Sequence, residues 1–134
     1  MNLPDLPKIN KRAEADFGTY TFLPWLLKVH RQDGIYELKV AGKNNRLPFS
    51  AVVTHQIQTL ELVRHGVFVY KPPDMGQRNP GDYICMVRKP AWIVVKYDSH
   101  FVMITIDNFN AERFKSKSKS LSFERAKEIA THVI

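Results

Sequence analysis

Glu37 and Lys39 are the two residues whose types and spacing suggest chemistry. They lie in "GIYELKVAG", residues 34–42, whose alternating apolar and polar residues predict a strand. Residues two apart on a strand point to the same face, so a carboxylate and an ammonium group would stand side by side. Such a pair can bind Mg²⁺ through the carboxylate and position a water or a phosphate through the lysine. On an exposed strand the same pair would be a loose ion pair of little energetic value, and the triplet alone does not decide between the two.

Two polar residues on predicted helices are candidates to join this pair. A helix is expected over residues 9–30, and Glu14 lies on its aromatic side, where a carboxylate is costly unless it has a partner or a metal. The same residue can instead serve as a first-turn acid favoured by the helix dipole. Gln56 lies on the buried flank of a second expected helix, residues 50–66, where its amide needs hydrogen-bond partners. In a catalytic site it would hold a ligand or a phosphate, and otherwise it would fix a neighbouring loop.

Two aspartates are candidates for a metal site near Glu37. Asp33 precedes Glu37 by four residues and would share its face if the strand began that early, although Asp33-Gly34 also has the composition of a turn. Asp82 opens a predicted strand directly after the turn-rich "PPDMGQRNPG", a position that suits a metal ligand beside a loop. A solvated aspartate is also common at the end of a strand. The residues alone leave both acids open as ligands.

The charge of the chain favours an anionic partner. Lys plus Arg number 20 against 13 for Asp plus Glu, which gives a net charge of +7 and a pI near 9.6. A small domain this basic commonly binds nucleic acid. The segments "GKNNR" and "RFKSKSKS" concentrate the cations in stretches that suit phosphate contacts, with solubilising surface loops as the alternative. The candidate DNA-binding residues are Lys43, Arg46, Arg113, Lys115, Lys117 and Lys119.

Length and composition predict one soluble domain. The 134 residues, of which 44% are hydrophobic and 25% charged, can bury one core without disulfides. The single cysteine, Cys85, lies in an apolar run, which indicates a small core residue and excludes an internal disulfide or a cysteine-based zinc site. The start of the chain lacks the apolar stretch of a secretory signal, and no window has the apolar length of a membrane span. We therefore expect a reducing cytoplasm, that of the host if the chain is viral.

The order of the predicted elements indicates an α/β fold in a single domain over residues 1–134. Residues 1–9 are expected to form a flexible arm before the first helix. The strands "DYICMV", "AWIVVKY" and "FVMITID" are joined by tight connections, so they are expected to be antiparallel neighbours. A basic loop over residues 109–121 and an amphipathic helix over residues 122–134 complete the chain. The order α, β, α, β, β, β, β, α predicts a mixed sheet with helices packed on it.

Together these segments resemble the PD-(D/E)xK nuclease superfamily, and within it the small Holliday junction resolvases of phages and bacteria, of the RecU and Hjc type. The resemblance rests on "KRAEADFG", "YELK", "LPFSAVVTHQIQTL", "YKPPD" and "GDYICM…PAWIVVKY", and it covers most of the chain from residue 11 to residue 107. "ELK" alone is a weak motif, whereas "ELK" followed by "PFSAV..HQI" is fairly specific. The implied fold is restriction-endonuclease-like, a mixed β-sheet flanked by α-helices.

The resemblance implies a metal-dependent endodeoxyribonuclease. By this resemblance Glu37 is a metal ligand, Lys39 is the catalytic lysine, and Glu14 matches a glutamate that many members carry on the first helix near the site. Gln56 falls in the matching "HQI" segment. Mg²⁺ is the implied cofactor, with Mn²⁺ able to replace it. The implied substrate is a branched DNA, the four-way junction, cut symmetrically on two strands by a homodimer.

The chain departs from the family pattern in one place. The superfamily usually has an aspartate on a strand upstream of the E-x-K strand, and there is little room for that hairpin before "YELK". Asp33 would then supply the missing acid, or Asp82 would supply it from another strand, together with the ligands Glu37 and Glu14. A nicking or repair endonuclease of the same superfamily, a non-catalytic DNA-binding module and a protein-interaction domain remain as alternatives.

Overall fold

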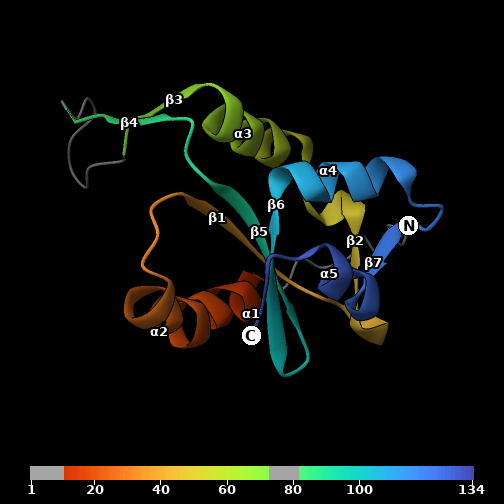
Figure 1. Cartoon of the computed structure of the whole chain (residues 1–134). Helices are drawn as coiled ribbons and strands as arrows, with labels where there is room; N and C mark the ends of the chain where they lie inside the picture. The colour runs from red at the N-terminus through yellow and green to blue at the C-terminus, as the bar shows by residue number, and fades with distance from the viewer. Residues whose placement is uncertain (1–10, 73–81) are drawn as a thin grey trace, which may run out of the picture.

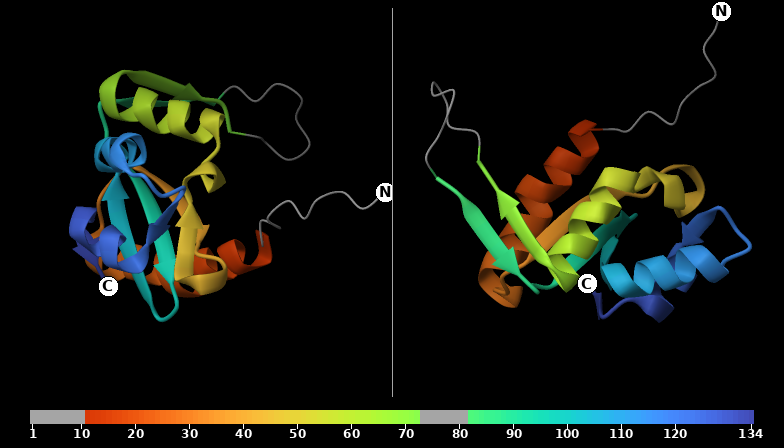
Figure 2. Two further views of the ribbon diagram at one scale, coloured as in Figure 1. Left: turned by 90° about the vertical axis from the view of Figure 1, so that its right-hand side faces the viewer. Right: turned by 90° about the horizontal axis from the view of Figure 1, so that it is seen from above.

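The centre of the protein is a four-stranded mixed sheet with helices on both faces (Figure 1; Figure 2). This computed structural model describes residues 11–72 and 82–134. The strand order is β1-β5-β6-β8, in which β1 is parallel to β5 and the other neighbours are antiparallel. The predicted α/β class, with a mixed sheet flanked by helices, is confirmed. The four strands are β1 (Ile35–Val40), β5 (Ala91–Tyr97), β6 (His100–Thr105) and β8 (His132–Val133).

One face of the sheet is covered by the N-terminal helix, which continues to His30. The sequence predicts that Pro24 ends or kinks this helix, or starts a second short helix. The residues on both sides keep right-handed helical φ and ψ values, so the helix continues, and Pro24 lies in the short α-helical stretch Leu23–Trp25. Pro24 lies between two π-helical stretches, where the hydrogen-bond ladder is already shifted, so its missing N–H group is tolerated. The expected start of this helix before residue 11 lies outside the described residues. Its stretches are α1 (Lys11–Asp16), η1 (Phe17–Phe22), α2 (Leu23–Trp25) and η2 (Leu26–His30).

The other face is covered by α3 (Thr54–His65), α4 (Ile106–Lys115) and α5 (Phe123–Ile129). Beside them, β2 (Arg46–Pro48) pairs antiparallel with β7 (Ser120–Ser122) in a small second sheet. The pairing joins the chain just after β1 to the chain just before α5. It therefore fixes the connection between the predicted active-site strand and α3.

The connection from β1 to α3 contains two short 3₁₀ turns, η3 (Lys43–Asn45) and η4 (Phe49–Ala51). The sequence predicts that the second helix begins at residue 50, whereas α3 begins at Thr54. Phe49 and Val52 are both buried in the core. Because these two side chains are buried, Phe49–Ala51 form a separate turn, and the α-helix begins only at Thr54.

A hairpin of β3 (Val67–Tyr70) and β4 (Ile84–Val87) projects from the domain between α3 and β5 (Figure 1; Figure 2). The prediction that "DYICMV" and "AWIVVKY" are neighbouring strands is wrong. β5 has β1 on one side and β6 on the other, so no edge of β5 is open to β4. Cys85, expected in the core, is exposed on this hairpin because the hairpin stands outside the main sheet.

The last part of the chain contains more regular structure than the sequence predicts. The segment 109–121 was expected to be a basic loop, but α4 continues to Lys115 and β7 begins at Ser120. The helix expected over residues 122–134 is shorter, since α5 ends at Ile129 and β8 follows. The Ser122 hydroxyl accepts the Arg125 N–H at 3.2 Å and caps α5. The final residues extend the main sheet instead of the helix.

The core has two parts, one on each face of the sheet. Aliphatic residues of β5 and β6 pack under α3, α4 and α5, and an aromatic cluster that includes Phe17, Phe22 and Phe101 packs under the N-terminal helix. β5 lies at the centre, and every residue in it except Lys96 is buried. Within residues 11–72 and 82–134, no helix has the length and apolar character needed to cross a bilayer.

Candidate active site

Glu37 and Lys39 lie on the edge strand β1, on the face that α3 covers. In the parallel register Glu37 is opposite Ile93 and Lys39 is opposite Val95, and both partners belong to the aliphatic core of that face. The Lys39 Nζ atom lies 3.4 Å from Glu37 Oε1, and the two side chains are 5% and 28% exposed, respectively. A lysine this buried is rare unless it is paired. The two residues therefore do not form a loose surface ion pair.

Gln56, in the first turn of α3, fixes the orientation of the Glu37 carboxylate. Its Nε2 atom donates a hydrogen bond of 2.9 Å to Glu37 Oε1, and its Oε1 atom accepts the Val53 N–H at 3.1 Å. The N–H groups at the start of a helix have no acceptor within the helix, so the second bond also caps α3. The other Glu37 oxygen, Oε2, has no hydrogen bond to a described residue. One carboxylate oxygen is thus held, and the other is available to a ligand.

Glu14 belongs to the same electrostatic cluster, although it comes from the helix on the opposite face. Partial burial raises the pKa of Glu14 above its ordinary value of 4.5; the Lys39 charge opposes this rise, and the Glu37 charge adds to it. β1 is an edge strand, so side chains from both faces can meet at its outer side. The cluster holds two carboxylates and one ammonium group, which leaves an excess of negative charge when all three are ionised.

Gly18 allows the N-terminal helix to approach β1 closely. A Cβ atom at this position would lie 3.0 Å from Leu38 Cδ1, a tighter contact than side chains normally make. Phe17 and Phe22 pack in the same cluster as Leu38 and hold the helix against the strand. Glu14 lies one turn before Gly18, so this close packing also brings Glu14 to β1.

The residues of this cluster fit a divalent cation with oxygen ligands. Mg²⁺ is usually held by one or two carboxylates, with water and substrate phosphate as the remaining ligands. Glu37 Oε2 has no hydrogen bond within residues 11–72 and 82–134, and a cation near Glu14 would offset both the partial burial of Glu14 and the neighbouring carboxylate. Neither residue offers the nitrogen or sulfur donors that zinc prefers. The donor set therefore suits Mg²⁺ or Mn²⁺.

Asp33 and Asp82, the two aspartates predicted as further metal ligands, do not join the cluster. β1 begins at Ile35, so Asp33 lies before the strand, where Lys89 Nζ is 2.7 Å from its carboxylate and lowers the pKa of Asp33. Asp82 is exposed next to β4, in the projecting hairpin (Figure 1). In residues 11–72 and 82–134, no three His, Cys, Asp or Glu side chains converge as a metal site. Of the four predicted ligands, Glu37 and Glu14 are the two whose charges influence each other in the structure.

Arg46, predicted to bind DNA, is engaged within the protein. Its Nε atom donates to Ser120 Oγ at 2.7 Å, and its Nη2 atom donates to Ser118 Oγ and Ser120 O, each at 3.1 Å. These bonds join β2 to β7 and to the residues before it. Arg46 therefore stabilises the small second sheet, and a contact with DNA would have to compete with three hydrogen bonds.

The other predicted DNA-binding residues differ in the contacts that their side chains make within the protein. Lys115 Nζ lies 3.9 Å from Glu112 Oε2, and the Arg113 guanidinium group lies 5.2 Å from the centre of the Phe114 ring. Both residues belong to α4, where the sequence predicts a loop. Three of the predicted residues are exposed and have no ion pair with a described residue: Lys43, Lys117 and Lys119.

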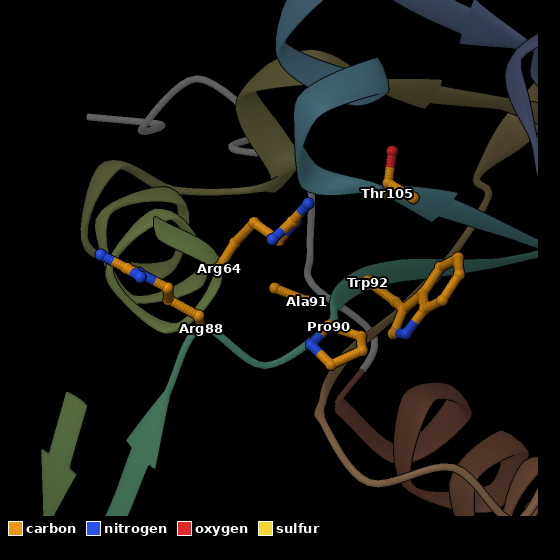
Figure 3. A pocket seen from close by; sticks show the side chains of 6 residues that line it. All are labelled: Arg64, Arg88, Pro90, Ala91, Trp92 and Thr105. Atoms are coloured by element: carbon orange, nitrogen blue, oxygen red, sulfur yellow. The ribbon is translucent and has the colours of Figure 1, made fainter. Parts of the chain in front are cut away.

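A hollow at the far end of α3 contains two arginines that no sequence pattern singles out. Arg64 is on α3 and Arg88 is in the linker between β4 and β5, so only the fold brings them to one place (Figure 3). No spacing in the sequence signals this site. Its volume is about 310 Å³, and its lining residues are Arg64, Arg88, Pro90, Ala91, Trp92 and Thr105.

Comparison of the chain with protein-family models, with curated proteins and with solved structures found no match.

Proposed function

We propose that this chain is a metal-dependent endodeoxyribonuclease with a restriction-endonuclease-like fold, which resolves four-way DNA junctions by paired, symmetric phosphodiester hydrolysis. The observation that supports this proposal best is the buried Lys39 ammonium group beside Glu37, with Gln56 holding the carboxylate and Glu14 in electrostatic contact. Titratable groups with a perturbed environment and a specific charge partner gather at catalytic sites.

The charge balance of the cluster favours a catalytic role over a structural one. A structural ion pair needs one cation for one anion, whereas here two carboxylates share one buried lysine. Burying an uncompensated charge is costly, so an excess of negative charge in a protein of net charge +7 needs a reason. Binding of a divalent cation would supply that reason.

The chain topology agrees with the resemblance of "YELK" and "HQI" to the PD-(D/E)xK superfamily. β1 carries Glu37 and Lys39, α3 carries Gln56, and β5 returns parallel to β1 at the centre of a mixed sheet. The hydrogen bond from Gln56 to Glu37 shows that the strand and the helix that hold the motif residues are packed directly against each other. Both elements are regular and rigid, which suits the positioning of catalytic groups.

Each residue of the cluster has a chemical role in the proposed reaction. Glu37 and Glu14 would hold Mg²⁺ or Mn²⁺, which acts as a Lewis acid and lowers the pKa of bound water. Lys39 carries three donor hydrogens and no acceptor, so it can contact a phosphate oxygen or orient the attacking water. Gln56 keeps the Glu37 carboxylate from rotating away from these partners.

Substrate binding is assigned to the exposed cations and to a second copy of the chain. Contacts from Lys43, Lys117 and Lys119 to phosphates would recognise the shape of branched DNA and not its sequence. A four-way junction has approximate two-fold symmetry, which suits a homodimer with two identical active sites. Symmetric cutting follows if each copy cleaves one of two opposed strands.

The test is cleavage of a labelled, immobile four-way DNA junction in Mg²⁺ and in EDTA. We would compare the wild type with Glu37→Gln and Lys39→Met. The matched control is the exposed pair Glu124 and Lys127 on α5, whose Nζ–Oε2 distance of 3.1 Å is similar, changed to Gln and Met in the same way. We expect paired nicks that need metal, a loss of at least about 100-fold in both Glu37 and Lys39 variants, and no loss in the controls. Wild type that binds the junction but cuts it with neither Mg²⁺ nor Mn²⁺ would contradict the proposal.

A DNA-binding module without cleavage is the second candidate, because only two carboxylates converge among the described residues. On that view Lys39 and Glu37 would form a buried structural pair, and Lys39→Met would change stability but leave junction binding intact. A related nicking endonuclease would instead cleave nicked or mismatched duplex faster than the four-way junction.

A further inference from the structure

The N-terminal helix, residues 11–30, has an apolar outer face. It forms the outer layer of the domain on the side of the sheet opposite α3, α4 and α5 (Figure 1; Figure 2). The side chains of Tyr20, Leu23 and Leu27 are 77%, 47% and 62% exposed, respectively. Their spacing of three and four residues puts them on one side of the helix, and we call this row the outer stripe. A single exposed apolar side chain is ordinary, whereas a contiguous row on a helix indicates a contact surface.

The outer stripe has a charge of opposite sign at each end. Asp16 precedes Tyr20 by four residues, and Arg31 follows Leu27 by four residues, so each lies about one turn beyond the apolar row. Both charged side chains are exposed, and neither has an ion pair with a described residue. Lys28, also exposed, adds a second cation at the Arg31 end. The stripe therefore runs from an anionic end to a cationic end.

This order of residues is complementary to itself when the helix is reversed. In an antiparallel pair of such helices with a two-fold axis between positions 23 and 24, positions whose numbers sum to 47 face each other. Asp16 of one copy then faces Arg31 of the other, and Tyr20 faces Leu27. Both anions meet cations, and the apolar residues of one stripe meet those of the other.

A parallel pair of the same helices does not have this property. It would place Asp16 beside Asp16 and Arg31 beside Arg31, and the repulsion of like charges opposes such a contact. In the antiparallel pair the two cations at residues 11 and 12 lie opposite positions 36 and 35, which come after the end of the second helix at His30. The charges of the helix therefore favour the antiparallel arrangement.

We propose that the outer stripe is the contact surface between two copies of this chain, packed antiparallel about a two-fold axis near Leu23. Such a contact is isologous, the kind that closes a homodimer and leaves no further site for growth. The inference rests on the proposed function, because it assigns a surface to the homodimer that symmetric cutting requires.

The size of the stripe predicts a weak dimer. One helix pair over about four turns buries less than the roughly 1,200 Å² that is typical of a stable interface. We therefore expect a dissociation constant on the order of 100 µM without DNA. A four-way junction that binds both copies would strengthen the dimer, because each copy then raises the local concentration of the other.

The same helix joins the proposed interface to the candidate active site. Glu14 lies on the inner side of the helix, in electrostatic contact with Glu37 and Lys39, whereas the outer stripe lies on the other side. From Glu14 to the two-fold axis is at most about 14 Å along the helix at 1.5 Å per residue. The two candidate active sites would thus lie toward opposite ends of one helix pair, which couples their positions.

The first test measures self-association by sedimentation equilibrium, without DNA and without metal. We would compare the wild type with Tyr20→Ser, and use Phe114→Ser as the matched control, because Phe114 on α4 is a similarly exposed aromatic residue at 81%. The change occurs twice in a two-fold dimer, so we expect Tyr20→Ser to raise the dissociation constant at least about tenfold and Phe114→Ser to leave it unchanged. Wild type that stays monomeric up to about 1 mM, or equal effects of the two variants, would overturn the proposal.

The second test reverses the charges at the two ends of the stripe. The variants are Asp16→Arg, Arg31→Asp and the combination of both; aspartate suits position 31 because the φ angle there is 48° and aspartate tolerates this left-handed region. Each single change places like charges opposite each other, so we expect weaker self-association. The double variant restores opposite charges in the antiparallel register, and we expect it to associate more tightly than either single variant. A double variant weaker than both single variants would overturn the proposed register.

The failure of this inference is distinguishable from the failure of the nuclease proposal. If the wild type cuts junctions with metal but Tyr20→Ser associates and cuts like Phe114→Ser, the candidate active site stands and the outer stripe is not the interface. If self-association depends on the stripe but no protein cuts DNA, the interface stands and the nuclease proposal fails. If both proposals hold, Tyr20→Ser should still nick junctions with metal, but fewer of the nicks should be paired.

Discussion

The described part of the chain contains two clusters in which a buried charged group meets charges of the opposite sign. In one, Glu112 of α4 is 6% exposed, and both of its oxygens accept hydrogen bonds of 2.9 Å from Arg125 of α5. Arg125 also bonds to Glu128 in the same helix. In the other, Lys39 is the buried group, and it contacts a single oxygen of Glu37.

The difference between the clusters lies in how completely the charge is satisfied. The Arg125 hydrogen bonds lower the pKa of Glu112, as expected for a carboxylate whose ionised form is stabilised by the fold. In the Lys39 cluster the pKa of Glu14 is raised, and one Glu37 oxygen has no hydrogen bond to a described residue. A complete bidentate pair is typical of a structural contact between two helices, whereas an incomplete one has capacity for a ligand. Variants that remove one charge from each cluster can separate these two roles.

The largest effect is expected from Lys39→Met. This variant keeps the length of the side chain and removes the ammonium group, so we expect a loss of junction cleavage of at least about 100-fold. Its free energy of unfolding should fall in EDTA, because Glu37 and Glu14 lose the ammonium group that offsets their charge. Urea unfolding would be measured together with single-turnover cleavage under conditions where the variant is fully folded. Cleavage that persists in the folded variant would indicate that Lys39 is a structural residue and would remove the contrast with Glu112.

Glu112→Ala is expected to lower stability and to leave cleavage unchanged. It removes a bidentate charged pair between α4 and α5, and we expect the free energy of unfolding to fall by about 2–3 kcal/mol. Cleavage per folded molecule should be unchanged, since Glu112 is not part of the Lys39 cluster. Chemical denaturation gives the first quantity, and cleavage under conditions where the variant is fully folded gives the second. A loss of activity without a loss of stability would contradict the comparison.

Gln56→Leu is expected to have an intermediate effect on both quantities. The variant loses the bond that orients Glu37 and the acceptor for the Val53 N–H, so cleavage should fall by about tenfold and stability by about 1 kcal/mol. Gln56→Glu keeps an acceptor for Val53 but adds a third carboxylate beside Glu37. We expect Gln56→Glu to restore the helix cap and not the activity, which circular dichroism and cleavage assays would separate.

The smallest effect is on the pH dependence of stability, where the two clusters have opposite signs. The pKa of Glu14 is raised above 4.5, so its ionised form costs stability, and this cost disappears as the pH falls through the folded-state pKa toward 4.5. The pKa of Glu112 is lowered below 4.5, so its contribution is present above 4.5 and is lost as the pH falls through its folded-state pKa. We expect Glu14→Gln to be more stable than the wild type at pH 7 but not near pH 4. We expect Glu112→Gln to be less stable than the wild type at pH 7, and this difference in the free energy of unfolding to narrow below pH 4.5. Unfolding in urea across this range measures both differences, and equal slopes for the two variants would contradict them.

The sequence predicts the elements of the candidate active site well because their signals are local. The alternation around Glu37 predicts β1, and the helical spacing after residue 54 predicts α3, so the side chains of Lys39 and Gln56 are assigned to the correct elements. Glu14 is predicted because it borders an aromatic stripe. Each of these assignments depends on neighbours within a few turns or residues.

Most differences between the predicted and the observed structure concern partners that are distant in the chain. Nothing in "DYICMV" shows that its neighbour is β3 and not β5, and this depends on β1 occupying the open edge of β5. Asp33 pairs with Lys89, and Arg46 bonds to Ser118 and to Ser120 of β7, through tertiary contacts that no local pattern encodes. The alternating lysines after residue 114 suggest a loop, but buried Phe109 anchors this segment as a helix up to Lys115.

The hairpin of β3 and β4 has a consequence for the order in which parts of the protein open. A two-stranded hairpin is marginally stable alone, and this one contributes only Phe68 and Met86 to the core while Val67, Val69 and Val87 are about half exposed. β5, in contrast, is covered on both faces. Backbone amides of the hairpin should therefore exchange with deuterium through local opening, and those of β5 only when the whole domain unfolds. The hairpin can therefore unfold and refold many times while the rest of the domain stays folded.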